Sequence, residues 1–90
     1  MCVLDVRLPQ DYRGAMGHIP QARNIPLAQL NQRRAELESC RDRPLAVVCN
    51  TNRMSGQAVV LLRAAGFRQV MLVQDGMQGW THQGFTTEKT

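Results

Sequence analysis

The 90-residue chain has few aromatic side chains and few cysteines, and each shortage argues against a class of protein. One tryptophan and one tyrosine leave little on which nucleic-acid bases could stack. The eleven lysines and arginines are scattered rather than gathered in one basic block, so a nucleic-acid partner is not expected. Three cysteines cannot all pair with one another and include no CxxC spacing, which argues against a disulfide scaffold and a metal site.

Long apolar runs and an excess of acidic residues are missing as well. No stretch approaches the roughly 20 apolar residues of a membrane-spanning helix, and the start, MCVLDVRL, lacks the layout of a signal peptide. We therefore expect a cytoplasmic protein, or a periplasmic one if a leader has been removed. Its net charge of +4 favours a small anion as ligand. We expect a monomer without a membrane span.

Short apolar runs alternate with helical patterns along the chain, which predicts an α/β fold with parallel strands. The clearest strand is LAVVC at 45–49, a continuous apolar run typical of a strand buried on both faces. We expect one domain over residues 1–85 and a flexible polar tail over 86–90. The expected strands are 2–6, 22–25, 45–49 and 70–73, and the expected helices lie near 9–13, 26–39, 55–65 and 77–83.

The segment after Cys49 joins this strand to a helix that we expect Ser55 to cap. Ligands of open α/β sheets collect beyond the carboxyl ends of strands, and a helix N-terminus there favours an anion and a thiolate. Small polar residues permit a curved loop whose amides turn inward, and Arg53 adds a positive charge. The pattern predicts a nucleophilic Cys49 in an anion-binding loop of Asn50, Thr51, Asn52, Arg53, Met54 and Ser55. A Cys49 side chain buried under the sheet would contradict this interpretation.

Several short motifs occur in a fixed order along the chain. They are LDVR at 4–7, DY at 11–12, GHIPQARNIPL at 17–27, VC at 48–49 with its loop, LLRAAGF at 61–67 and GMQGW at 76–80. Over nearly its whole length the chain resembles the rhodanese family of sulfurtransferases. The loop looks closest to the compact, phage-shock-protein type of thiosulfate sulfurtransferase.

The resemblance implies a three-layer fold with a mostly parallel, four-stranded sheet in which the Cys49 strand lies between the first and the last strand. It implies that Cys49 takes a sulfane sulfur from thiosulfate or a persulfide donor and holds it as a persulfide. The acceptor would be cyanide or a thiol, which a partner protein could carry. Asp5, Arg7 and His18 would support the site by hydrogen bonds rather than react. No cofactor and no metal is implied.

Two positions of the loop depart from the pattern of many single-domain rhodaneses. Arginine is common at the fifth position after the cysteine and glycine at the third, whereas this chain has Met54 and Asn52, with Arg53 at the fourth. The donor preference therefore stays open.

Two other functions fit parts of the pattern. A phosphatase is disfavoured because its loop needs arginine six positions after the cysteine, where this chain has Ser55. A non-enzymatic persulfide relay or partner-binding module stays open.

The remaining cysteines are not expected to react. Cys2 lies within an expected strand and is interpreted as a packing residue. Cys40 follows an expected helix in polar surroundings and is interpreted as a surface thiol, with a resolving role towards Cys49 as the alternative. Trp80 and Met77 are expected in the core under the last helix.

Overall fold

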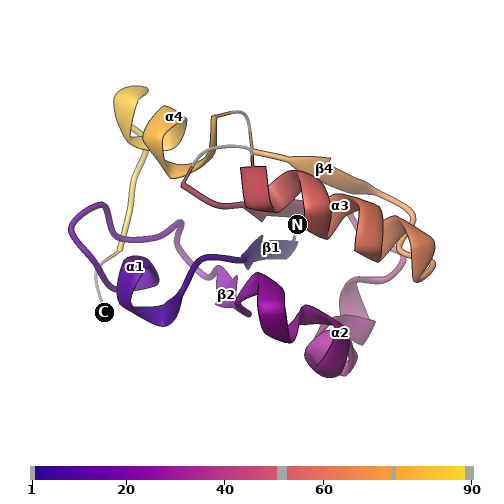
Figure 1. Cartoon of the computed structure of the whole chain (residues 1–90). Helices are drawn as coiled ribbons and strands as arrows, with labels where there is room; N and C mark the ends of the chain where they lie inside the picture. Colours follow the sequence, from indigo (N-terminus) through magenta and orange to yellow (C-terminus); the bar gives the residue numbers. More distant parts are fainter. Residues whose placement is uncertain (1, 51–52, 74, 89–90) are drawn as a thin grey trace.

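A computed structural model describes residues 2–50, 53–73 and 75–88, which form an α/β domain (Figure 1). Four parallel strands lie in the order β2-β1-β3-β4. Their bounds are Cys2–Asp5 for β1, Arg23–Asn24 for β2, Leu45–Val48 for β3 and Val70–Leu72 for β4. The strand that precedes Cys49 therefore lies between the first and the last strand, which confirms the expected sheet.

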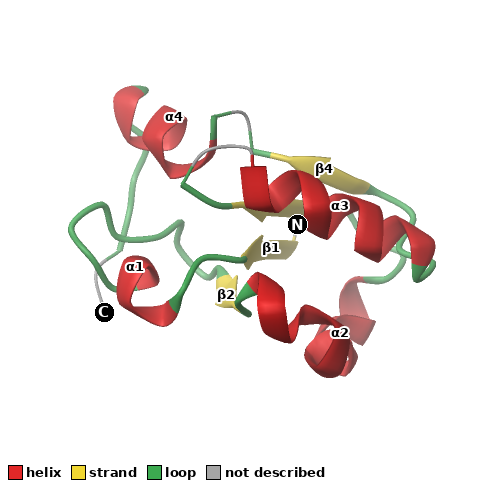
Figure 2. Ribbon diagram, in the orientation of Figure 1, coloured by secondary structure: helices red, strands yellow, loops and turns green. Residues whose placement is uncertain are grey.

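Helices lie on both sides of this sheet (Figure 2). They are α1 at Pro9–Tyr12, α3 at Arg53–Ala64 and α4 at Gly76–His82. The single helix expected over 26–39 is wrong. That segment consists of the 3-10 turn η1 at Leu27–Gln29, α2 at Leu30–Arg33 and the 3-10 helix η2 at Arg34–Cys40.

The break in this segment has a backbone cause. Arg33 has a φ of −110° and a ψ of 12°, outside the helical range, so α2 ends there, and Gln29, which precedes α2, has a φ of −105°. Leu30 and Leu37 are its buried anchors, while most of the other side chains face solvent. Packing of these two leucines therefore determines the path of the segment more than helix propensity does.

Successive side chains of the strands point to opposite faces of the sheet and pack into two separate hydrophobic cores. One core lies between the sheet and the helices α2, η2 and α3, and it includes Leu4, Leu45, Val47, Cys49, Ala58 and Leu62. The other lies on the opposite face, under α4 and the segment that leads into β2, and it includes Ile19, Ala22, Val48 and Met77. The sheet thus has packed layers on both faces, as the family resemblance implied. Met77 is fully buried as expected, whereas Trp80 is only half-buried.

The end of the chain differs from the loose tail that we expected. Glu88 pairs with His18 in an antiparallel bridge, in which each backbone N–H donates to the other residue's carbonyl at 2.8 Å. The indole of Trp80 also donates to the carbonyl of Thr86 at 2.8 Å. The described part of the tail is therefore bound to the domain.

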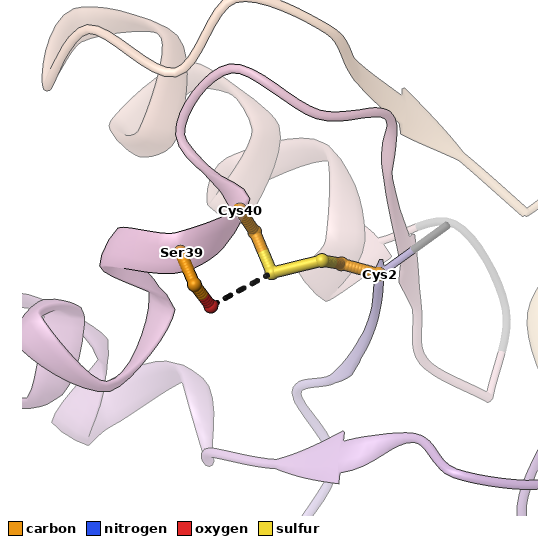
Figure 3. Close-up of a disulfide and its surroundings, with 3 residues drawn as sticks. All are labelled: Cys2, Ser39 and Cys40. Carbon is orange, nitrogen blue, oxygen red and sulfur yellow. Dashed lines mark hydrogen bonds between the residues drawn. A yellow bond between two sulfur atoms is a disulfide. The ribbon is translucent and has the colours of Figure 1, made fainter.

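Cys2 and Cys40 form a disulfide, with an S–S distance of 2.06 Å and a Cα–Cα distance of 6.2 Å (Figure 3). Interpreting Cys2 as packing and Cys40 as a surface thiol was wrong, and Cys40 is only 9% exposed. The sheet explains the pairing. Cys2 lies opposite Leu45 in the register of β1 and β3, and its N–H donates to the carbonyl of Pro44. Because η2 ends at Cys40 shortly before this turn, the two sulfurs meet at the amino end of the sheet.

Candidate functional site

Cys49 directly follows β3, at the carboxyl end of the sheet. Leu45, Val47 and Cys49 alternate onto the face that α3 covers, so the thiol is directed at the start of this helix. Its Sγ donates a hydrogen bond to the Ser55 hydroxyl oxygen, with 3.4 Å between the two atoms. The predicted position of Cys49, between the central strand and a helix N-terminus, is therefore what the structure shows.

The start of α3 lies earlier than expected. The helix begins at Arg53, so Ser55 belongs to its first turn rather than capping it, and Met54 and Ser55 are helical rather than loop residues. The predicted cradle of inward-turned amides rests partly on Thr51 and Asn52, which lie outside the described residues, as does the side chain of Arg53.

Cys49 is covered by its surroundings. The residue is only 1% exposed and belongs to the core cluster under α3. Its direction, towards the first turn of α3, agrees with the predicted chemistry. The thiol lies under the first turn of α3 rather than under the sheet, so the interpretation is not contradicted on that ground, but a thiol that is 1% exposed is not an open nucleophile. A reactant would reach this sulfur only after the groups that cover it move aside.

Arg7 connects three segments around the site. Its guanidinium is completely buried and donates to both carboxylate oxygens of Asp5 at 2.8 to 3.1 Å. It also donates to the carbonyl of Gly17 at 2.7 Å and to the side-chain oxygen of Asn50 at 3.4 Å. A buried charge needs such pairing, because removing either partner leaves the other uncompensated. Asp5 and Arg7 thus lie together beside Asn50, and their role in supporting the site stays a prediction.

His18 is buried beside α1. Its ring stacks on Tyr12 with 3.7 Å between the ring centroids, and its Nδ1 lies 3.1 Å from the Tyr12 carbonyl oxygen. Its Nε2 lies 3.8 Å from the carboxylate of Glu88. Burial, followed by the negative charges of Asp5 and Glu88, raises the pKa of Tyr12, whose hydroxyl donates to the Ala22 carbonyl. His18 thus contacts α1 and the end of the chain, and its supporting role at the site stays a prediction.

The first turn of α4 is a part of the site that the sequence interpretation missed. The N–H of Met77 donates to the carbonyl of Cys49 at 2.6 Å, and that of Gln78 donates to the carbonyl of Asn50 at 3.1 Å. Asp75 and Gly76 have φ angles of 59° and 58°, and this left-handed turn directs the start of α4 at the end of β3. An Asp-Gly pair favours a turn, but a sequence does not show which segment such a turn will face.

The disulfide lies at the other end of the sheet from Cys49. Cys2 is opposite Leu45, four residues before Cys49, which is roughly 13 Å along a strand at its usual rise. Cys40 is moreover already bonded to Cys2. The alternative of Cys40 as a resolving thiol for Cys49 is therefore wrong for this structure.

Neither a metal site nor a membrane-spanning helix is found in the part of the chain that the structure describes. Its histidine, cysteine and acidic side chains form no group of three that could hold a metal ion. None of its described helices has the length and apolarity to cross a membrane.

The domain is a layered α/β fold with a parallel sheet. Its central strand ends at a cysteine that lies against the first turn of a helix, and this end of the sheet is a candidate site centred on that cysteine. Comparison with known proteins gives the family. Residues 1–83 match the sequence model of the rhodanese-like domain, and the chain belongs to this family.

Relatives and solved structures agree with this assignment. The chain is 38% identical over 78 residues to the uncharacterized protein YqhL of Bacillus subtilis, and covers 59% of it with 87% of its own length. It is 36% identical over 67 residues to the thiosulfate sulfurtransferase PspE of Escherichia coli, with 74% of this chain and 62% of PspE aligned. The crystal structure of a rhodanese-like domain from Anabaena superimposes with a TM-score of 0.83 at 34% identity, covering 97% of both chains.

The chain thus spans about three fifths of the length of these two curated relatives. Family membership and a relative that is a sulfurtransferase support sulfur transfer in general.

Proposed function

We propose that this chain is a sulfurtransferase that moves a sulfane sulfur from thiosulfate or a persulfide donor to cyanide or a thiol through a persulfide on Cys49. One observation carries the proposal: the Cys49 thiol leaves the central strand and contacts Ser55 in the first turn of α3, at 3.4 Å. The similarity to PspE, a thiosulfate sulfurtransferase, supports thiosulfate as the donor.

The first step is attack of the Cys49 thiolate on the outer sulfur of thiosulfate. A Cys49–sulfur bond forms, the sulfur–sulfur bond of thiosulfate breaks, and its electron pair leaves with sulfite. In the second step the acceptor attacks the outer sulfur of the persulfide, and the electron pair of the broken bond returns to Cys49 as a thiolate. The two steps form a double displacement without an external oxidant or reductant.

The first turn of α3 supplies positive potential for this chemistry. Helix N-terminal amides and the helix dipole favour the negative charge that the sulfur carries before and after each step. The Ser55 hydroxyl can donate its proton to that charged sulfur. The Arg7 guanidinium holds the side chain of Asn50, the residue after the nucleophile. In this proposal Asn50, Thr51, Asn52, Arg53, Met54 and Ser55 surround the donor anion.

The burial of Cys49 supports a second candidate. A thiol that is 1% exposed meets small substrates only when its cover moves, and this limits turnover. A persulfide relay with little turnover of its own therefore competes with the enzyme. Persulfide formation with negligible transfer to cyanide would identify the relay.

The disulfide bears on where the protein works. Disulfides persist in oxidising compartments and are rare in the cytosol. The Cys2–Cys40 bond therefore favours the periplasm, or another oxidising compartment, over the cytoplasmic location expected from the sequence.

Intact mass after exposure to thiosulfate tests the proposed function. The wild type should gain the mass of one sulfur atom and lose it again with cyanide or a reductant. Cys49→Ser should gain nothing, whereas the matched double variant Cys2→Ser/Cys40→Ser should gain the same sulfur as the wild type. An adduct that persists in Cys49→Ser, or that disappears only in the double variant, contradicts the assignment.

A further inference from the structure

An apolar groove of about 480 Å³ opens beside the candidate site. It lies between the end of β1, η1 and α3. We call it the apolar groove, and define it by Val6, Leu8, Leu27, Ala28, Met54 and Leu61. Leu8, which follows β1, is 52% exposed although it is a large apolar side chain.

The walls of the apolar groove are formed by segments that also flank Cys49, although Cys49 itself does not line it. On one side, the N–H of Val6 donates to the carbonyl of Val48 at 3.0 Å, so this wall lies against the residue that precedes the nucleophile. On the other side, Met54 immediately precedes Ser55, whose hydroxyl contacts the Cys49 sulfur. Met54 and Val6 pack in the same cluster as Cys49. A ligand in the groove therefore lies against the end of β1 and the first turn of α3, the two segments that contact Val48 and Cys49.

The small substrates of the proposed reaction would not bind in an apolar groove. Thiosulfate and cyanide are hydrated ions, and apolar walls do not stabilise them. An apolar side chain gains from leaving water there. Contacts away from the reacting atoms can also offset the displacement of the groups over Cys49, which a small thiol has too few contacts to do.

We propose that the apolar groove receives the sulfur acceptor, and that this acceptor is a cysteine of a partner protein with large apolar side chains beside it. This inference rests on the proposed function, because it assigns the second substrate of the same site. The acceptor thiolate attacks the outer sulfur of the Cys49 persulfide. A new sulfur–sulfur bond forms on the partner, the bond to Cys49 breaks, and the electron pair returns to Cys49 as a thiolate.

Two peptides of equal length, each with one cysteine, test the groove as an acceptor site. One has leucine and phenylalanine next to the cysteine, and the other has serine at both positions. With persulfide-loaded wild type, mass spectrometry should show the apolar peptide accepting sulfur about tenfold faster, as expected for partial burial of one large apolar side chain. Leu8→Glu should reduce this ratio to about one.

Val60→Glu is the matched control. Val60 is 68% exposed on α3 and does not line the apolar groove, so the same change of charge there should leave the ratio intact. Equal rates for the two peptides with the wild type would overturn the proposal. The proposal would also be overturned if Leu8→Glu kept the faster transfer to the apolar peptide. It would likewise be overturned if Val60→Glu reduced the ratio of the two rates as much as Leu8→Glu does.

A binding measurement separates failure of the groove from failure of the proposed function. The apolar peptide with serine in place of its cysteine is labelled, and its fluorescence anisotropy is followed with unloaded protein. Saturable binding that Leu8→Glu weakens and Val60→Glu does not is the expected result, and absence of binding overturns the proposal without any chemistry. If the peptide binds but thiosulfate leaves no sulfur on Cys49, the proposed function has failed, and the acceptor role fails with it.

Discussion

Removal of the Cys2–Cys40 disulfide should lower the free energy of unfolding by about 4 kcal/mol. The bond joins residues that are 38 positions apart. Closing a loop of this length in the unfolded chain removes roughly 13 cal/mol/K of entropy, which is about 4 kcal/mol at 25 °C. A domain of this kind has only about 5–15 kcal/mol of stability in total. The disulfide therefore accounts for a large share of what keeps this 90-residue chain folded.

Urea unfolding of the oxidised wild type and of Cys2→Ala/Cys40→Ala measures this effect. For a small domain, each molar of urea lowers the stability by about 1 kcal/mol, so the midpoint should fall by about 4 M. Each single variant already lacks the bond, so the double variant should be little less stable than either one. Intact mass checks that the wild type is oxidised, since it should be two hydrogens lighter than its reduced form.

Two results would refute the reasoning. A midpoint shift below about 0.5 M would mean that the crosslink restricts the unfolded chain far less than its length implies. Additive losses in the two single variants would mean that side-chain packing, rather than the bond, is the source of the stability. Sulfur loading of Cys49 by thiosulfate should persist in the folded double variant, because the two sites lie at opposite ends of the sheet.

Two further predictions concern the first turn of α3. Arg53→Ala should raise the Michaelis constant for thiosulfate about fivefold with a smaller effect on the turnover number, because one ion pair in contact with water is typically worth about 1 kcal/mol. The effect should be smaller at high salt. Arg68→Ala, at an exposed position in the loop before β4, is the control, and an unchanged Michaelis constant in Arg53→Ala would show that the amides bind the anion alone. Ser55→Ala should slow persulfide formation about fivefold, since one hydrogen bond of about 1 kcal/mol to the charged sulfur is lost. Single-turnover mass spectrometry measures the rate of persulfide formation. A rate equal to that of the wild type would mean that the Ser55 hydroxyl does not stabilise the reacting sulfur.

The parts of the fold that follow from local patterns could be predicted from the sequence. The continuous apolar run at 45–49 predicted the central strand, and the switch to helical spacing after Ser55 predicted α3. Together they placed Cys49 at the carboxyl end of the sheet, because a parallel strand followed by a helix leaves few other arrangements. The resemblance to rhodaneses supplied the place of this strand between the first and the last strand, which the apolar pattern alone does not contain.

The disulfide, the broken helix after β2 and the covered thiol could not be predicted in this way, because each depends on contacts between distant segments. Cys2 and Cys40 looked unrelated until the register placed Cys2 opposite Leu45, beside the turn that follows η2. The path of 27–40 depends on where Leu30 and Leu37 reach the sheet. The cover over Cys49 depends on how α3 packs, and burial of this kind has no signature in the loop sequence.

Two backbone amides in the first turn of α4 can be used to measure how often the backbone beside Cys49 opens. The amide of Met77 is bonded to the Cys49 carbonyl and that of Gln78 to the Asn50 carbonyl. A bonded backbone amide exchanges its hydrogen for deuterium only while the bond is broken, so its exchange rate gives the free energy of that opening. These two amides therefore record how often the backbone around the nucleophile loosens. If the cover over Cys49 moves together with this backbone, their exchange would follow the approach of a substrate without any label on the sulfur itself.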